Sequence, residues 1–383
     1  MEHFEIIIPV IFGLEAFVSR EIRALGYETT SVEDGRVTFL GDFKAICRAN
    51  LWVRCGERIM IKVAEFEART FTELFDATKA VDWSRWIPAN AAFPVTGFCL
   101  KSILASMRDC QSIIKKAVVD SLGAKYSITH FEETGATYQI RFSIMKDRVT
   151  LMLDTTGDGL HKRGYRAISN AAPLKETIAA AMIMLSHWKY EYPLADPLCG
   201  SGTIPIEAAM IKRNIAPGLT RNFLSEHFIQ CPDKLWKEAR EEALDLKKNV
   251  PLQIFASDID PKTVEIAKNN AITAGVGDAV TPVVGNVADF YTDIPYGTII
   301  SNPPYGERLG DEDMCRELYT SMGKAFKKLD KWSYYILTSN EDFEKTFGKK
   351  ADKKRKLYNG MLKCNIYQYF GERPPKIFKE SIK

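Results

Sequence analysis

Strands alternate with helices over the second half of the chain, from about residue 173 onward. Short apolar runs predict strands at Pro193–Asp196, Leu252–Ser257, Thr281–Val284, Gly297–Ser301, Ser333–Leu337 and Leu362–Phe370. Helical periodicity separates them at 173–188, 203–213, 233–248, 261–274 and 313–329. This alternation favours parallel βαβ units, and therefore an α/β fold with a doubly wound, mostly parallel sheet. A ligand of such a sheet is expected outside the carboxyl ends of its strands.

The N-terminal part has a different, α+β texture. Its first 66 residues follow the order β-α-β-β-α-β, with a hairpin expected to turn at Asp34-Gly35. Beyond them we expect helices at 70–79 and 110–122, and strands at 93–100, 138–143 and 149–154. Catalytic side chains do not cluster in this part of the sequence. We therefore interpret it as a binding module.

Composition narrows the class of protein. The 383 residues are 46% hydrophobic, with 52 basic and 49 acidic side chains, as in ordinary globular chains. A bilayer span needs about 18 consecutive apolar residues, which we do not find, and the N-terminus lacks the basic region of a secretory signal. The eight cysteines form no CxxC pair and the five histidines do not cluster, so we expect no metal site. Reduced thiols and a cytoplasmic location are expected.

Basic residues gather in two places. Residues 345–383 hold 12 Lys or Arg and three Asp or Glu. A shorter cluster in mid-chain contains Lys162, Arg163, Tyr165 and Arg166. Each alone could be a solvated face, but two such clusters flanking one domain fit binding to a phosphate backbone better.

The sequence Asp196-Pro-Leu-Cys-Gly-Ser-Gly-Thr203 connects an expected strand to a helix. Its glycines, Gly200 and Gly202, allow close approach of the backbone to a ligand, and the next helix begins with free N–H groups. The spacing matches neither GxGxxG nor GxxxxGK[ST], so it indicates neither a dinucleotide fingerprint nor a P-loop.

Asp258 ends the next strand, in the sequence Ser257-Asp-Ile-Asp260. An acid at this position can accept both ribose hydroxyls of an adenosine-containing cofactor. The usual gap from the glycine loop is about 20 residues. Here the gap is 258 − 202 = 56, which implies an insertion. Asp260, which precedes Pro261, is expected to cap the helix that follows.

Asn302-Pro303-Pro304-Tyr305 follows the apolar strand that ends at Ser301. Two prolines restrict the backbone, so the Asn302 side chain and the Pro303 carbonyl can be fixed acceptors. Acceptors aimed at an exocyclic amine favour its charge-developing transition state, while Tyr305 offers a face for base stacking. A sulfonium methyl donor is already electrophilic, so a strong base is not needed. The motif indicates methyl transfer to nitrogen.

These three motifs resemble those of class I S-adenosylmethionine-dependent N-methyltransferases. The stretches 159–166 and 172–176 resemble the junction before the catalytic domain of THUMP-containing RNA methylases. Asn214–Gly218 and Asn302–Leu309 resemble the RlmL-type enzymes that methylate guanine N2 in 23S ribosomal RNA. The chain is identified on these residues as a member of that family, UPF0020.

The resemblance implies three domains: a ferredoxin-like domain at 1–65, a THUMP RNA-binding domain at 66–157 and a Rossmann-like methyltransferase domain at 158–383, with an insertion at about 214–250. It also implies cofactor contacts by the following residues: Asp196, Cys199, Gly200, Gly202, Thr203, Asp258, Ile259, Asn286 and Val287. Asn302, Pro303, Pro304 and Tyr305 would hold the target amine, and Lys162, Arg163, Tyr165 and Arg166 the RNA.

The function expected from the resemblance is formation of N2-methylguanosine in 23S rRNA or a large-subunit precursor, with S-adenosylhomocysteine as co-product. Three alternatives stay open: the same reaction on tRNA, adenine-N6 methylation of DNA, and a non-catalytic RNA-binding assembly factor. Neither a membrane nor a metal partner is expected, and the sequence leaves the oligomeric state open.

Overall fold

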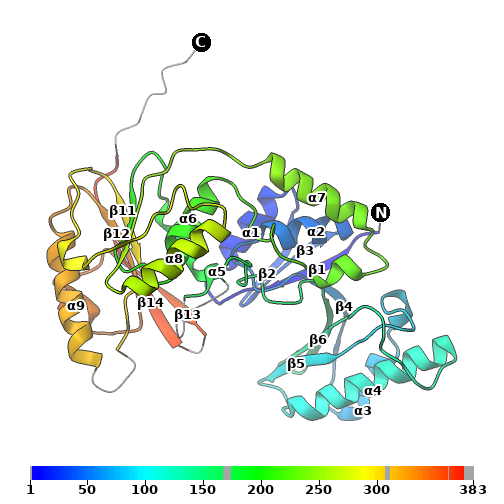
Figure 1. Cartoon of the computed structure of the whole chain (residues 1–383). Helices are drawn as coiled ribbons and strands as arrows, with labels where there is room; N and C mark the ends of the chain where they lie inside the picture. The colour runs from blue at the N-terminus through cyan, green and yellow to red at the C-terminus, as the bar shows by residue number, and fades with distance from the viewer. Residues whose placement is uncertain (1, 167–173, 307–310, 361, 375–383) are drawn as a thin grey trace. The chain divides into compact units, whose positions relative to one another are not determined.

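A computed structural model describes residues 2–166, 174–306, 311–360 and 362–374 of the chain (Figure 1). The chain forms two compact units. The N-terminal unit comprises Met1–Val10, Val18–Leu160 and Gly218–Asp245. The C-terminal unit comprises Ile11–Phe17, His161–Pro217 and Leu246–Lys383. Among the described residues, no helix combines the length and the apolar character that crossing a membrane requires.

One sheet organises the N-terminal unit. Its elements are β1 (Phe4–Pro9), α1 (Glu15–Ala24), β2 (Thr29–Glu33), β3 (Arg36–Gly41), α2 (Phe43–Trp52), β4 (Met60–Glu67), α3 (Phe71–Lys79), β5 (Val95–Leu100), α4 (Met107–Tyr126), β6 (Ile140–Met145) and β7 (Arg148–Asp154). The strand order is β2-β3-β1-β4-β7-β6-β5. Strand β4 pairs with both β1 and β7. The two expected N-terminal domains therefore share a continuous sheet, and the expected boundary at residue 65 falls inside β4.

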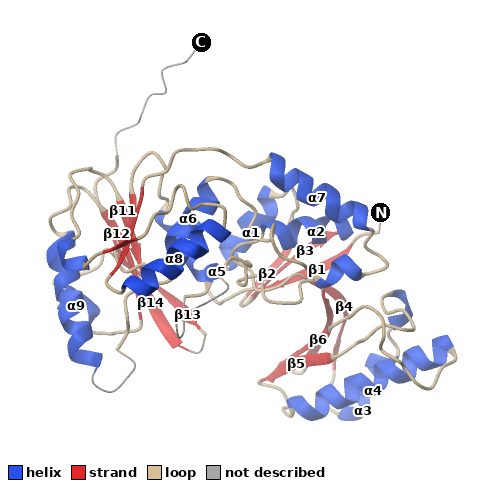
Figure 2. Ribbon diagram, in the orientation of Figure 1, coloured by secondary structure: helices blue, strands red, loops and turns tan. Residues whose placement is uncertain are grey.

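Local signals place several of these elements. Gly35 has φ +80°, the left-handed conformation that the β2–β3 turn requires. Thr70 and Glu73 form a capping box that starts α3. Helices α3 and α4 pack beside each other along the β5–β6 half of the sheet (Figure 2). The β-α-β-β-α-β order predicted for the first 66 residues is confirmed.

The insertion packs with the N-terminal unit, whereas we expected it in the methyltransferase domain. Its helix α7 (Asp233–Asp245) lies against α2. Arg48 on α2 donates two hydrogen bonds to the Glu242 carboxylate, at 2.9 and 2.8 Å. Helical periodicity predicts α7 but does not say which surface it covers, because an amphipathic helix fits many apolar faces.

The C-terminal unit contains the predicted doubly wound sheet. Its elements are α5 (Glu176–Ser186), β8 (Leu194–Asp196), α6 (Thr203–Lys212), β9 (Ile254–Asp258), α8 (Pro261–Thr273), β10 (Val283–Val284), β11 (Thr298–Ser301), α9 (Asp311–Phe326), β12 (Ser333–Thr338), α10 (Phe343–Phe347), β13 (Lys353–Asn359) and β14 (Leu362–Tyr369). The order is β10-β9-β8-β11-β12-β14-β13. Strands β10, β9, β8, β11 and β12 are parallel and β14 is antiparallel to β12, so the mostly parallel sheet is confirmed.

Strand β13 was not predicted. Four consecutive cations, Lys353-Lys354-Arg355-Lys356, begin it, and they hide the alternation that normally indicates a strand. The strand forms because each of its residues pairs with β14. Much of the basic C-terminal stretch is thus part of the folded sheet. Its last nine residues and the start of the expected helix at 173 lie outside the described residues.

Candidate active site

The motifs meet where the strand order reverses. The chain passes from β8 to β9 and β10 on one side, then returns to β11 and β12 on the other. Asp196 ends β8, Asp258 ends β9, and Asn302 follows the last residue of β11. Because these strands are parallel, all three residues lie at the same edge of the sheet. This is the switch point at which doubly wound sheets bind ligands.

The glycine loop depends on two left-handed residues. Gly200 has φ +52° and Gly202 has φ +85°. A Cβ atom at Gly202 would lie 3.2 Å from Cβ of Ala267 on α8 and 3.2 Å from Ile206, so strain and crowding both favour glycine there. A Cβ at Gly200 would meet nothing within 4 Å. The loop is therefore packed tightly at Gly202 and open at Gly200, as expected for a backbone that approaches a ligand.

Asp258 ties this loop to the end of β9. Its Oδ2 accepts a hydrogen bond from the Gly200 N–H at 3.0 Å, and its Oδ1 accepts one from the Asp260 N–H at 3.1 Å. Neighbouring Ile259 is an apolar side chain left 65% exposed. A carboxylate for hydroxyls next to an uncovered apolar surface for a base fits the adenosine half of a cofactor.

Asp258→Ala is expected to weaken cofactor binding by about 10- to 100-fold, because hydrogen bonds to a charged group contribute about 1.5–3 kcal/mol. Titration calorimetry with S-adenosylhomocysteine measures this. Asp260→Ala is the matched control, because Asp260 caps α8 through the Lys262 and Thr263 N–H groups. It should lower stability by about 1 kcal/mol and leave affinity nearly unchanged. Equal affinities for the wild type and Asp258→Ala would contradict the ribose role.

Ser301 is a site residue that the sequence interpretation missed. Asp196 is almost fully buried, and its Oδ1 accepts a hydrogen bond from the fully buried Ser301 Oγ at 2.7 Å. The Leu198 N–H donates to the same oxygen at 3.3 Å. Burial raises the pKa of Asp196 to about 7 from an ordinary value of 3.8. Ser301 precedes Asn302 directly, so this bond links the glycine-loop strand to the proline motif.

The raised pKa gives Asp196→Asn a pH-dependent effect on stability. The folded chain holds the Asp196 proton more tightly than the unfolded chain, so this stabilisation is present at acid pH and is lost as the pH rises from 3.8 through about 7. Between pH 5 and pH 8, the wild type should lose about 2–3 kcal/mol more stability than Asp196→Asn. Urea denaturation without cofactor tests this. Parallel pH profiles would show that Asp196 titrates normally.

Asn302 and Tyr305 contact each other. The Tyr305 hydroxyl donates a hydrogen bond to Asn302 Oδ1, and burial raises the pKa of that hydroxyl well above its usual range. The Pro304 carbonyl accepts a hydrogen bond from the Tyr319 hydroxyl at 2.6 Å, which fixes the loop against α9. A carbonyl oxygen has two lone pairs, so Asn302 Oδ1 can bind Tyr305 and still accept from a substrate amine.

Four of the predicted cofactor residues have side chains that are buried or hydrogen-bonded to a neighbouring residue. Cys199, Thr203 and Val287 are buried, and Val287 belongs to the apolar core. Their contacts with a cofactor stay predictions. Asn286 caps a short 3-10 turn, accepting from the Ala288 N–H at 3.0 Å. Its adenine contact stays a prediction.

The predicted RNA contacts of Arg163 and Tyr165 are contradicted by their burial. Arg163 is 2% exposed and pairs with Glu207 on α6, with Nε 3.2 Å from Oε1. The Tyr165 hydroxyl donates to the same carboxylate at 3.4 Å. Arg166 is mostly buried and donates to Thr203 Oγ1 at 2.5 Å. Lys162 is the exposed member of the cluster. The cluster therefore mainly holds its segment of the chain against α6 within the C-terminal unit.

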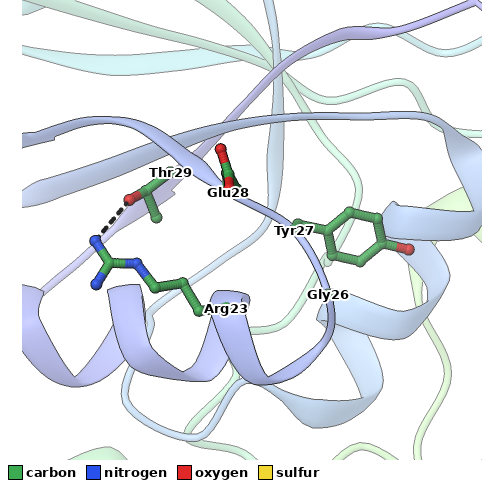
Figure 3. A pocket seen from close by; sticks show the side chains of 5 residues that line it. All are labelled: Arg23, Gly26, Tyr27, Glu28 and Thr29. Carbon is green, nitrogen blue, oxygen red and sulfur yellow. Dashed lines mark hydrogen bonds between the residues drawn. The ribbon is translucent and has the colours of Figure 1, made fainter.

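A pocket of about 600 Å³ lies elsewhere, between the end of α1 and the start of β2 (Figure 3). Its lining is mostly polar: Arg23, Gly26, Tyr27, Glu28 and Thr29. Arg23 lies across it and donates to Thr29 Oγ1 at 3.5 Å. None of the motif residues lines this pocket, so it is not the candidate active site.

Three family profiles match consecutive parts of the chain. They describe an RlmL ferredoxin-like domain at residues 5–60, a THUMP domain at 68–154, and the UPF0020 RMKL-like methyltransferase domain at 163–368. The third alone covers more than half of the chain.

Several known proteins are similar over nearly the whole length. "Putative RNA methyltransferase YpsC" of Bacillus subtilis is 50% identical over 380 residues, which are 98% of each chain. A structure from Listeria monocytogenes, described as "a predicted N6-adenine-specific DNA methylase", is 50% identical with TM-score 0.92 and covers 97% of both chains. The structure of SMU.472 complexed with SAH is 44% identical, with TM-score 0.92, and covers 98% of this chain and 100% of that one.

SMU.472, a closely similar chain, is complexed with SAH, the product that S-adenosylmethionine leaves after methyl transfer. The THUMP match assigns an RNA-binding domain to residues 68–154, which precede the methyltransferase match in the sequence. The chain therefore belongs to the UPF0020 family of RMKL-like methyltransferases, as an S-adenosylmethionine-dependent RNA methyltransferase with RlmL-type ferredoxin-like and THUMP domains.

Proposed function

We propose that this enzyme forms N2-methylguanosine in 23S rRNA or a large-subunit precursor, in the cytoplasm. The observation that carries the proposal is the Asn302 carbonyl oxygen, held by Tyr305 at the switch point of the sheet. The RlmL-type ferredoxin-like match supports a ribosomal rather than a transfer RNA substrate. The eight free cysteines are consistent with a reducing compartment.

Asn302 and Pro303 orient the substrate amine in this proposal. Asn302 Oδ1 and the Pro303 carbonyl accept its two N–H groups, which directs the nitrogen lone pair toward the methyl carbon. S-adenosylmethionine, when bound, supplies an electrophilic methyl group on a sulfonium. The N–C bond forms as the C–S bond breaks, and the amine then releases a proton to water. Tyr305 orients the Asn302 amide through its hydroxyl and offers its ring to the base.

Asp196, Gly200, Gly202 and Asp258 are proposed to hold the cofactor. Asp258 would accept the ribose hydroxyls, and Ile259 would cover one face of the adenine. Asp196 and the glycines would line the amino-acid end, where Gly200 leaves room for close approach. Asn286 is the proposed partner of the adenine amine.

DNA adenine methylation is the second candidate, favoured by the description of the Listeria relative. An adenine N6 amine presents the same two N–H groups to Asn302 as a guanine N2 amine does. The THUMP match and the description of YpsC both favour RNA instead.

Transfer of labelled methyl groups from S-adenosylmethionine distinguishes these substrates. Unmodified large ribosomal RNA, unmodified tRNA and DNA are offered side by side, and the products are digested to nucleosides. We expect N2-methylguanosine in the large ribosomal RNA alone. Label in tRNA would show that the substrate is tRNA. N6-methyladenine in DNA would contradict both the proposed base, guanine, and the proposed nucleic acid, RNA.

A further inference from the structure

Strands β13 and β14 pair as an antiparallel hairpin (Figure 1). Three exposed lysines lie on one face of this hairpin. Its antiparallel register pairs Lys354 with Tyr367, Lys356 with Asn365, and Tyr358 with Lys363. Directly paired residues project to the same side, as do residues two apart along a strand. Lys354, Lys356 and Lys363 therefore occupy three successive rows, about 6.6 Å apart, of what we call the lysine face.

The opposite side of the hairpin is anchored in the core. Leu357, Cys364 and Ile366 are at most 1% exposed. The apolar packing beneath Lys356 and Lys363 holds this part of the hairpin in place, independently of the lysines themselves. In the third row, Tyr367, which pairs with Lys354, is itself buried, and Lys354 forms an ion pair with Glu344.

Two aromatic rings lie among these cations. Lys356 Nζ is 5.2 Å from the centroid of the Tyr358 ring. Phe12 contacts Tyr358 edge-on, with 6.5 Å between the ring centroids, and Phe12 is 49% exposed. Cations that alternate with aromatic rings are typical of surfaces that bind single-stranded nucleic acid, because the rings stack on bases while the cations contact phosphates.

The charge is too concentrated to be explained by protection of a sheet edge alone. Residues 345–369 contain seven lysines, one arginine and one aspartate. Lysines often protect edge strands from pairing. However, Lys363 lies on β14, which is paired on both sides by β12 and β13. At β13 itself, Arg355 donates a hydrogen bond to the Gly13 carbonyl, so the segment 11–17 already lies against this strand.

The surface thus combines exposed cations with aromatic rings on which bases can stack. We propose that Lys356 and Lys363 of the lysine face, with Phe12 and Tyr358, bind a single-stranded segment of the RNA substrate, with the lysines on phosphates and the rings against bases. This inference rests on the RNA methyltransferase activity of the family.

Binding of a fluorescein-labelled, 20-nucleotide single-stranded RNA tests the inference without catalysis. Affinities of the full chain, saturated with S-adenosylhomocysteine, are measured at several salt concentrations. Lys356→Gln/Lys363→Gln should reduce the slope of log affinity against log salt by about 1.4–1.8, since each phosphate contact contributes about 0.7–0.9. Phe12→Leu/Tyr358→Leu should weaken binding about 10-fold and leave the slope unchanged.

Lys234→Gln/Lys237→Gln is the matched control, because it removes two exposed lysines of α7 and the same net charge. Its slope should equal that of the wild type. A wild-type slope in the Lys356→Gln/Lys363→Gln variant, with cofactor affinity intact, would overturn the proposal. Phosphate contacts do not read the base, so the result is independent of whether guanine is the methylated base.

Discussion

Asn302→Ala should lower kcat by about 10²–10³-fold, the effect expected when one hydrogen-bonding group to a transition state is removed. The reason is geometric: Asn302 Oδ1 is the acceptor that the structure fixes at the switch point, through the Tyr305 hydroxyl. Cofactor affinity should stay within about twofold, because the cofactor contacts are assigned to β8 and β9. Single-turnover methyl transfer gives the rate, and calorimetry with S-adenosylhomocysteine gives the affinity.

Tyr305→Phe is the matched variant for this experiment. It retains the ring and removes the hydroxyl that orients the Asn302 amide. Turnover should fall about 5- to 15-fold, the effect of losing a hydrogen bond of about 1–1.5 kcal/mol. If Asn302→Ala kept more than a third of the wild-type kcat, the assignment of Asn302 as the amine acceptor would be wrong.

Arg163→Ala should destabilise the protein by about 3–5 kcal/mol, because it leaves the buried Glu207 carboxylate without its cation. The Arg163 and Glu207 side chains are at most 1% exposed, and Nη2 lies 3.4 Å from Oε2. Urea denaturation at pH 7 measures the loss. The salt dependence of RNA binding by the folded fraction should not change, in contrast to a residue that contacts phosphate.

The double variant Arg163→Met/Glu207→Leu distinguishes pairing from packing. Removing both charges should recover much of the stability lost in Arg163→Ala, since neither buried group is then left unpaired. A loss below about 1 kcal/mol in Arg163→Ala would instead indicate that water reaches the Glu207 carboxylate and solvates this ion pair.

The sequence predicted the catalytic sheet because glycines, acids and prolines follow its strands at fixed places. Asp196, Asp258 and Asn302 each end or follow an apolar run, and parallel pairing brings them to one edge. The sequence could not assign Ser301. A serine at a strand end has no periodic signature, and only the register of β8 with β11 brings it to Asp196.

For the basic clusters, the sequence did not predict which residues are buried or which form a strand. Residue type alone does not determine exposure: Arg163 and Tyr165 in one cluster are buried, and both pair with Glu207, 42 to 44 residues away. The cluster at 353–356 became a strand because β14 supplies its pairing partners. In both cases the deciding contact lies outside the basic cluster itself, so a count of charges within the cluster does not predict it. The placement of α7 on α2 is a third contact of this kind.

In the proposed function, Asn302 directs methyl transfer to the N2 amine of a guanosine in the large ribosomal RNA. The most direct test is mass spectrometry of nucleosides from large ribosomal RNA of cells that lack this protein. We expect one N2-methylguanosine to disappear, to return with the wild-type chain, and to stay absent with Asn302→Ala. An unchanged set of ribosomal nucleosides, or restoration by Asn302→Ala, would contradict this role of Asn302.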